Sequence, residues 1–187
     1  MRKIIIILIP LALFCYQQLS GQQSDKAYTF VCANGKTHFY ASTVMEDIEA
    51  TSDMTACAIN TKTKKISAKV AMESFVFRRK KMQDDFNEDY AESSKYPYAI
   101  LDAVISGADF AKDGTYDVTL KGTFEMHGVK VNREIKGKLT IKDGQPVSAT
   151  AQFEVKLVDH KIKVPTIVVM KIAEVVKVDV NLVFKKY

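Results

Sequence analysis

Residues 116–141 show a side-chain alternation that reverses once. From Tyr116 to Met126 the even-numbered residues are apolar, aromatic or glycine, and the odd-numbered residues are polar. After His127-Gly128 the apolar residues are mainly odd-numbered. A period of two indicates a strand with one buried face, and a reversal across a glycine indicates a tight turn. The pattern therefore predicts a long antiparallel hairpin that turns at residues 126–129.

Other segments with the same alternation lie on both sides of this hairpin. Asn34-Gly35 is a strong hairpin signal and predicts a turn between two short strands. The expected strands are residues 27–32, 36–42, 47–60, 66–72, 99–105, 149–157 and 176–184. Because turns join most of them, the sheet is expected to be antiparallel. We therefore predict an all-β chain of about eight strands, and closing eight strands leaves an interior for one ligand.

One segment has a helical period instead. Met82, Phe86 and Tyr90 lie four residues apart and form one apolar stripe. The basic residues 78–81 oppose the helix dipole, so the helix is expected to begin near Met82. It is expected to cover one end of the core. The acidic side chains between the apolar ones are interpreted as a solvated face: Asp84, Asp85, Glu88 and Asp89.

The amino terminus resembles a secretory signal peptide. Arg2-Lys3 precedes an apolar run over residues 4–16, and the small residues Ser20-Gly21 follow it. We predict that residues 1–21 are removed and that residues 22–187 form one domain, periplasmic or secreted. A lipoprotein signal at Cys15 is the weaker alternative, because Phe14 stands where a small side chain is needed.

The predicted mature chain carries 25 basic and 22 acidic side chains, a net charge of +3. This weak excess is spread over the polar strand faces, so it argues against nucleic-acid binding. The mature chain keeps Cys32 and Cys57, which could form one disulfide in an exported protein. Cys57 has an odd number in a strand whose even positions are the apolar ones. A disulfide and two separate thiols both stay open.

No constellation typical of catalysis stands out. The histidines are His38, His127 and His160, and no two have a metal-ligand spacing. His127 is a candidate general base, but no recognisable nucleophile or orienting acid surrounds it. We favour a role in the turn, where its ring bonds neighbouring backbone. The sequence predicts no enzyme, no metal and no cofactor.

Three motifs carry a resemblance to a known family. They are the helix segment of residues 77–90, then Tyr96-Pro97 followed by Ala99 and Leu101, then Gly122 leading to His127-Gly128-Val129 and Lys130. Their order and spacing are similar to those of the YceI-like family. The chain departs in Leu101, where the family often has Phe, and in Val131-Asn132, where it often has Pro-Val. The resemblance implies a lipocalin-like extended antiparallel barrel, exported, that holds a long isoprenoid-type lipid.

The alternation of odd and even positions and the family resemblance together predict which residues contact the ligand. Arg133 lies on the apolar side of its strand; it is expected either to meet an anionic head group at the barrel mouth or to be paired or snorkelling. The predicted ligand-binding residues are Phe75, Phe77, Met82, Phe86, Leu101, Ile105, Val118, Leu120, Phe124, Met126, Arg133 and Phe153.

The function expected from the sequence is to bind an apolar, isoprenoid-type lipid. Two alternatives stay open: an enzyme that acts on such a lipid, and an envelope or stress interaction module with a filled barrel. Whether the protein forms a homodimer also stays open.

Overall fold

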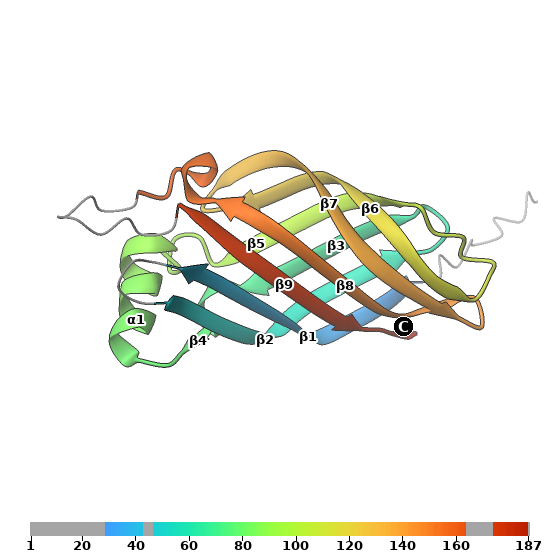
Figure 1. The fold of residues 1–187 in the computed structure, drawn as a ribbon, viewed down its shortest axis with the longest axis horizontal. Coiled ribbons are helices and arrows are strands. Elements are labelled where there is room, and N and C mark those ends of the chain that lie inside the picture. Colours follow the sequence, from blue (N-terminus) through green and yellow to red (C-terminus); the bar gives the residue numbers. More distant parts are fainter. Residues whose placement is uncertain (1–28, 43–46, 164–173, 187) are drawn as a thin grey trace, which may run out of the picture.

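Eight long antiparallel strands form a closed barrel (Figure 1). The computed structural model describes residues 29–42, 47–163 and 174–186. Each strand pairs with its neighbour in sequence, and β1 closes the barrel by pairing with β9. The eight strands are β1 (Thr29–Ser42), β2 (Asp47–Asn60), β3 (Lys65–Ala71), β5 (Tyr98–Ser106), β6 (Gly114–Met126), β7 (Val129–Lys142), β8 (Gln145–Lys156) and β9 (Val175–Val183).

Short elements complete the fold. Strand β4 (Val76–Phe77) pairs with β2, and β10 (Lys185–Lys186) pairs with β1. Two 3₁₀ turns, η1 (Met72–Ser74) and η3 (Leu157–His160), follow β3 and β8. In the described part of the chain, every helix is too short or too polar to cross a lipid bilayer.

The predicted hairpin of β6 and β7 is confirmed. Met126 pairs with Val129, and His127 and Gly128 between them have φ angles of 52° and 71°. Positive φ at both central residues is the turn geometry that matches the twist of the two strands. Asp143-Gly144 joins β7 to β8 with the same sign of φ. Both turns were therefore encoded locally.

The predicted turn at Asn34-Gly35 is wrong, because β1 continues through it as one strand. The pairing of β1 with β2 has irregularities on both sides of Gly35. A Cβ atom at Gly35 would overlap the Leu182 side chain and lie 3.0 Å from the carbonyl oxygen of Thr55. Glycine is needed here for a close approach between strands, which a bulge with a sharp bend provides.

A second irregularity reverses the inward face of β2. Gly35 is opposite Thr55 and Thr37 is opposite Ser52, so β2 has one extra residue between these pairs. Beyond the bulge the odd-numbered residues face the core, and Met54 is 63% exposed. Cys57 therefore faces inward, contrary to the simple alternation. It lies opposite Cys32, and both are buried free thiols.

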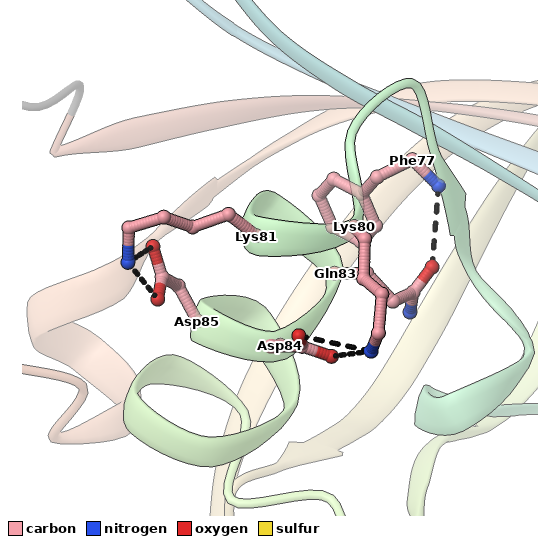
Figure 2. Close-up of polar contacts among 6 residues, drawn as sticks. All are labelled: Phe77, Lys80, Lys81, Gln83, Asp84 and Asp85. Carbon is pink, nitrogen blue, oxygen red and sulfur yellow. Dashed lines mark hydrogen bonds and ion pairs between the residues drawn. The ribbon is translucent and has the colours of Figure 1, made fainter.

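The predicted helix is present and begins at Lys80 rather than near Met82. It consists of α1 (Lys80–Asp85) and a wider π-helical turn, η2 (Phe86–Tyr90), in which the Ala91 N–H donates to the Phe86 carbonyl. Figure 2 shows why lysines are tolerated in its first turn. The ammonium groups of Lys80 and Lys81 each lie 2.9 Å from a carboxylate one turn later, those of Asp84 and Asp85.

Candidate ligand-binding cavity

The barrel contains a cavity of about 590 Å³ that is partly open to solvent. Its size lies within the range of small-molecule sites. The interior of an eight-stranded barrel is only just wide enough for side chains to fill it, so small inward residues leave room. Such residues line this cavity on four strands: Ala68, Ala99, Gly137, Ala149 and Ala151.

One end of the cavity is aliphatic. It lies near the turns that join β2 to β3 and β7 to β8, at the end of the barrel away from α1 (Figure 1). The side chains that reach the cavity there include Ile66, Ile105, Leu120, Leu139 and Leu182. Lys138 also borders the cavity, but its side chain is exposed and its ammonium group lies 2.8 Å from Asp117 at the surface. The chemistry of this end suits a hydrocarbon chain.

The other end is aromatic and lies beneath α1. Phe39 is central, with ring centroids 5.2 Å from Phe75 and 5.6 Å from both Phe77 and Phe86. Phe86 comes from the helix, and Met82 on the same helix also lines the cavity. The backbone N–H of Phe77 donates to Gln83 Oε1 at 3.3 Å, which ties β4 to α1 (Figure 2). Met82 and Phe86 of the apolar stripe thus pack over one end of the barrel interior, as predicted.

The structure brings together all but one of the predicted ligand-binding residues. Their contact with a ligand stays a prediction. The residues that line the cavity are Phe75, Phe77, Met82, Phe86, Leu101, Ile105, Val118, Leu120, Phe124, Met126 and Phe153.

Arg133 is the exception. The ladder between β7 and β8 runs only from Gly137 to Lys142, so Arg133 lies where the two strands have separated. Its guanidinium donates to the backbone carbonyl of Glu154 across this gap. The expectation that Arg133 is paired matches the structure. The expectation that it contacts a ligand in the cavity does not, because Arg133 is not part of the cavity wall. Strand separation explains how an inward position can hold a charged side chain.

His127 joins three segments at the helix end of the cavity. Its Nδ1 lies 3.1 Å from the carbonyl oxygen of His160, and its Nε2 lies 3.0 Å from Oε1 of Glu92. The Tyr96 ring packs against it at a centroid distance of 4.4 Å. The hydrogen bond from His127 is the main cause that lowers the pKa of Glu92, with Lys95 adding to it. Both ring nitrogens have partners, so the ring has a structural role. The prediction that it bonds neighbouring backbone is wrong, because its partners are 33 and 35 positions away and one of them is the carboxylate of Glu92.

His160 is fully buried on η3. Its ring packs edge-on against Phe124, and its Nδ1 lies 3.2 Å from the carbonyl oxygen of Met126. Burial lowers its pKa. In the described part of the chain, no group of three or more histidine, cysteine or acidic side chains is placed to hold a metal ion.

Two buried hydroxyls in the wall were missed by the sequence reasoning. Thr37 on β1 and Thr55 on β2 both line the cavity, and their Oγ1 atoms are 2.6 Å apart. The alternation of odd and even positions did not predict them, because the two bulges change which positions of β1 and β2 face inward. The only sequence signal was the nearby Gly35, interpreted as a turn. Glu92 was likewise missed, because it is 35 positions away from His127.

A closed antiparallel barrel around an apolar cavity defines a lipocalin-like class of architecture. Within that class the sequence profile of the YceI-like domain matches residues 23–184. The chain therefore belongs to the YceI-like family.

Solved structures share this fold at low sequence identity. A polyisoprenoid binding domain from Saccharophagus degradans, implicated in plant cell wall breakdown, has a TM-score of 0.66 and 15% identity, covering 86% of this chain and 99% of its own. BcnA from Burkholderia cenocepacia has a TM-score of 0.62 and 15% identity, covering 81% and 96%. The YceI protein from Campylobacter jejuni has a TM-score of 0.51 and 16% identity, covering 66% and 72%. A search of curated proteins gave no significant match.

Proposed function

We propose that this protein binds an apolar, isoprenoid-type lipid inside the barrel, as a carrier or scavenger. The observation that carries the proposal is the cavity, whose walls are aliphatic at one end and aromatic at the other. Burying a long chain contributes about 25 cal/mol per Å² of apolar surface, so affinity needs no catalytic group. The polyisoprenoid-binding domain of Saccharophagus degradans, which has this fold, supports the choice of ligand class.

The proposal includes export. The predicted signal peptide, residues 1–21, lies outside the described residues. A periplasmic or secreted carrier would collect its lipid outside the cytoplasm. Amino-terminal sequencing of the exported protein should give a start near Gln22, and a start at a lipid-modified Cys15 would contradict a freely diffusing carrier.

Blocking the cavity tests lipid binding. Leu120 is buried on the inner face of β6 and lines the cavity. Leu120→Trp should fill this space and abolish uptake of N-phenyl-1-naphthylamine, an uncharged apolar fluorophore, with the far-ultraviolet spectrum unchanged. Native mass spectrometry of the wild type, purified from a lipid-rich extract, should show a bound lipid that the variant lacks.

The matched control is Lys121→Trp, which adds the same ring to the outer face of the same strand. Lys121 is exposed and lies 3.1 Å from Glu134 at the surface. This variant should take up the fluorophore as the wild type does. Undiminished uptake by folded Leu120→Trp would mean that the ligand lies elsewhere.

The alternatives have less support. A barrel of this shape serving only as an interaction module needs no internal space, yet the described residues surround about 590 Å³. An enzyme needs an activated polar group at the cavity. His127 is the histidine in the cavity wall, and partners occupy both of its nitrogens. Binding is therefore the function that the geometry favours.

A further inference from the structure

Thr37 and Thr55 form a polar spot in an otherwise apolar part of the cavity wall. Thr37 is 5% exposed and Thr55 is 4% exposed. Along β1, Thr37 lies between Cys32 of the aliphatic cluster and Phe39 of the aromatic cluster. The hydroxyl pair thus lies between the aliphatic end and the aromatic end of the cavity.

The hydrogen-bonding capacity of the pair is not used up. Each threonine hydroxyl has one hydrogen to donate, and the bond of 2.6 Å between the two oxygens uses one of these two hydrogens. Among the described residues, neither hydroxyl has a second hydrogen-bond partner. Leaving a buried donor without a hydrogen-bond partner is destabilising. The second hydrogen is therefore available to an oxygen inside the cavity.

The barrel leaves space in the ladder row that contains Thr37. Thr37 pairs with Val180, Val180 with Ala151, and Ala151 with Gly137. All four residues line the cavity, and two of them have minimal side chains. A chain in the cavity can therefore carry a small substituent at this level.

The surroundings indicate that this substituent is uncharged. The charged side chains that border the cavity are Lys69, Arg79, Lys81, Asp85 and Lys138. The four basic ones are exposed, and at the surface Lys81 pairs with Asp85 and Lys138 with Asp117. The pair of threonines itself offers only hydroxyls. A charged group at this depth would lose its hydration without gaining an opposite charge, which is costly.

We propose that the bound lipid carries an uncharged hydrogen-bond acceptor, such as a ketone or ester carbonyl, along its buried part, and that the Thr37–Thr55 pair donates its second hydrogen to it. This inference rests on the proposed function and names the substituent that selects among apolar ligands. A site built to bond a ligand oxygen disfavours the analogue without it, because the buried donor is then left unpaired.

An isomer series tests the proposal with the unmodified protein. Pentadecane and its 2-, 5- and 8-ketones are delivered from cyclodextrin, and displacement of N-phenyl-1-naphthylamine gives their affinities. We expect the affinities of the three ketones to differ about five- to tenfold, because a net hydrogen bond contributes about 1 kcal/mol and only one position aligns with the threonines. Equal affinities for all three ketones would overturn the inference.

Variants of the two threonines test whether their hydroxyls cause the preference for one ketone. In Thr37→Val/Thr55→Val the best ketone should lose about five- to tenfold in affinity, while pentadecane binds no more weakly than before. Thr37→Ser/Thr55→Ser keeps both hydroxyls and should keep the selectivity. Selectivity that survives in the folded valine variant would overturn the inference.

The chain supplies a matched control. Thr115 and Thr140 form a similar cross-strand pair, 3.1 Å between oxygens, but outside the cavity lining, with Thr115 exposed and Thr140 partly buried. Thr115→Val/Thr140→Val should leave every affinity unchanged, and an equal loss of selectivity there would count against the inference. If pentadecane and the ketones all bind the wild type without selectivity, only the inference fails. If neither the fluorophore nor any ligand binds, the proposed function fails as well.

Discussion

The two ends of the barrel are closed in different ways. At the end away from α1, aliphatic side chains such as Ile59, Ile135 and Leu139 are no more than 1% exposed. At the helix end the seal includes Met82 and Phe86, which are only partly buried, and α1 has no fully buried residue. Fully buried aliphatic side chains thus close one end, while a short helix covers the other. Local opening should be easiest at α1, because this helix buries few apolar contacts of its own.

The largest expected effect is at the aliphatic end. Leu139→Ala should lower the free energy of unfolding by about 3–4 kcal/mol, because it removes fully buried methyl groups and enlarges the cavity that Leu139 lines. Urea denaturation measures this loss. Val183→Ala is the control, since Val183 is 69% exposed and should change little. A loss below about 1 kcal/mol for Leu139→Ala would remove the contrast between the ends.

An intermediate effect is expected from the thiols at the same end. Burial, with a smaller contribution from Cys32, raises the pKa of Cys57 from 9.0 to about 12. The unfolded chain releases this proton first, so the stability contributed by the neutral thiol is complete below pH 9 and is lost as the pH rises toward 12. In reducing buffer, unfolding at pH 11 should be easier by about 2 kcal/mol than at pH 9.

Cys57→Ala separates this effect from other alkaline titrations. The variant should show a shallower loss of stability between pH 9 and pH 11 than the wild type. Identical pH profiles would mean that Cys57 is accessible to water, which would weaken the picture of a dry aliphatic end.

The smallest effect is expected at the helix end. Complete burial of Phe86 would make Phe86→Ala cost about 3–5 kcal/mol, but the ring is only partly buried. We expect a loss of about 1–2 kcal/mol by urea denaturation, with exposed Val76→Ala as the control. A loss equal to that of Leu139→Ala would show that both ends are equally sealed.

Local sequence patterns determined much of this protein. The reversal of parity at His127-Gly128 specified the β6–β7 hairpin, since a two-residue turn and its flanking alternation are encoded within one segment. The spacing of Met82, Phe86 and Tyr90 located the helix. Parity on β5 and β6 also placed Leu101, Val118 and Leu120 on the cavity side, because a regular strand keeps its alternation.

Only the tertiary structure decided the rest. Gly35 lies in a continuous strand because Leu182 of β9 and Thr55 of β2 approach its backbone, and these contacts come from distant parts of the chain. The bulges that result reverse the inward faces and bring Thr37 and Thr55 together. Arg133 is not part of the cavity wall, because the pairing of β7 with β8 ends at Gly137, before it reaches Arg133. Alternation is a property of one strand, whereas a bulge, a gap between strands and an internal cavity depend on how neighbouring strands meet.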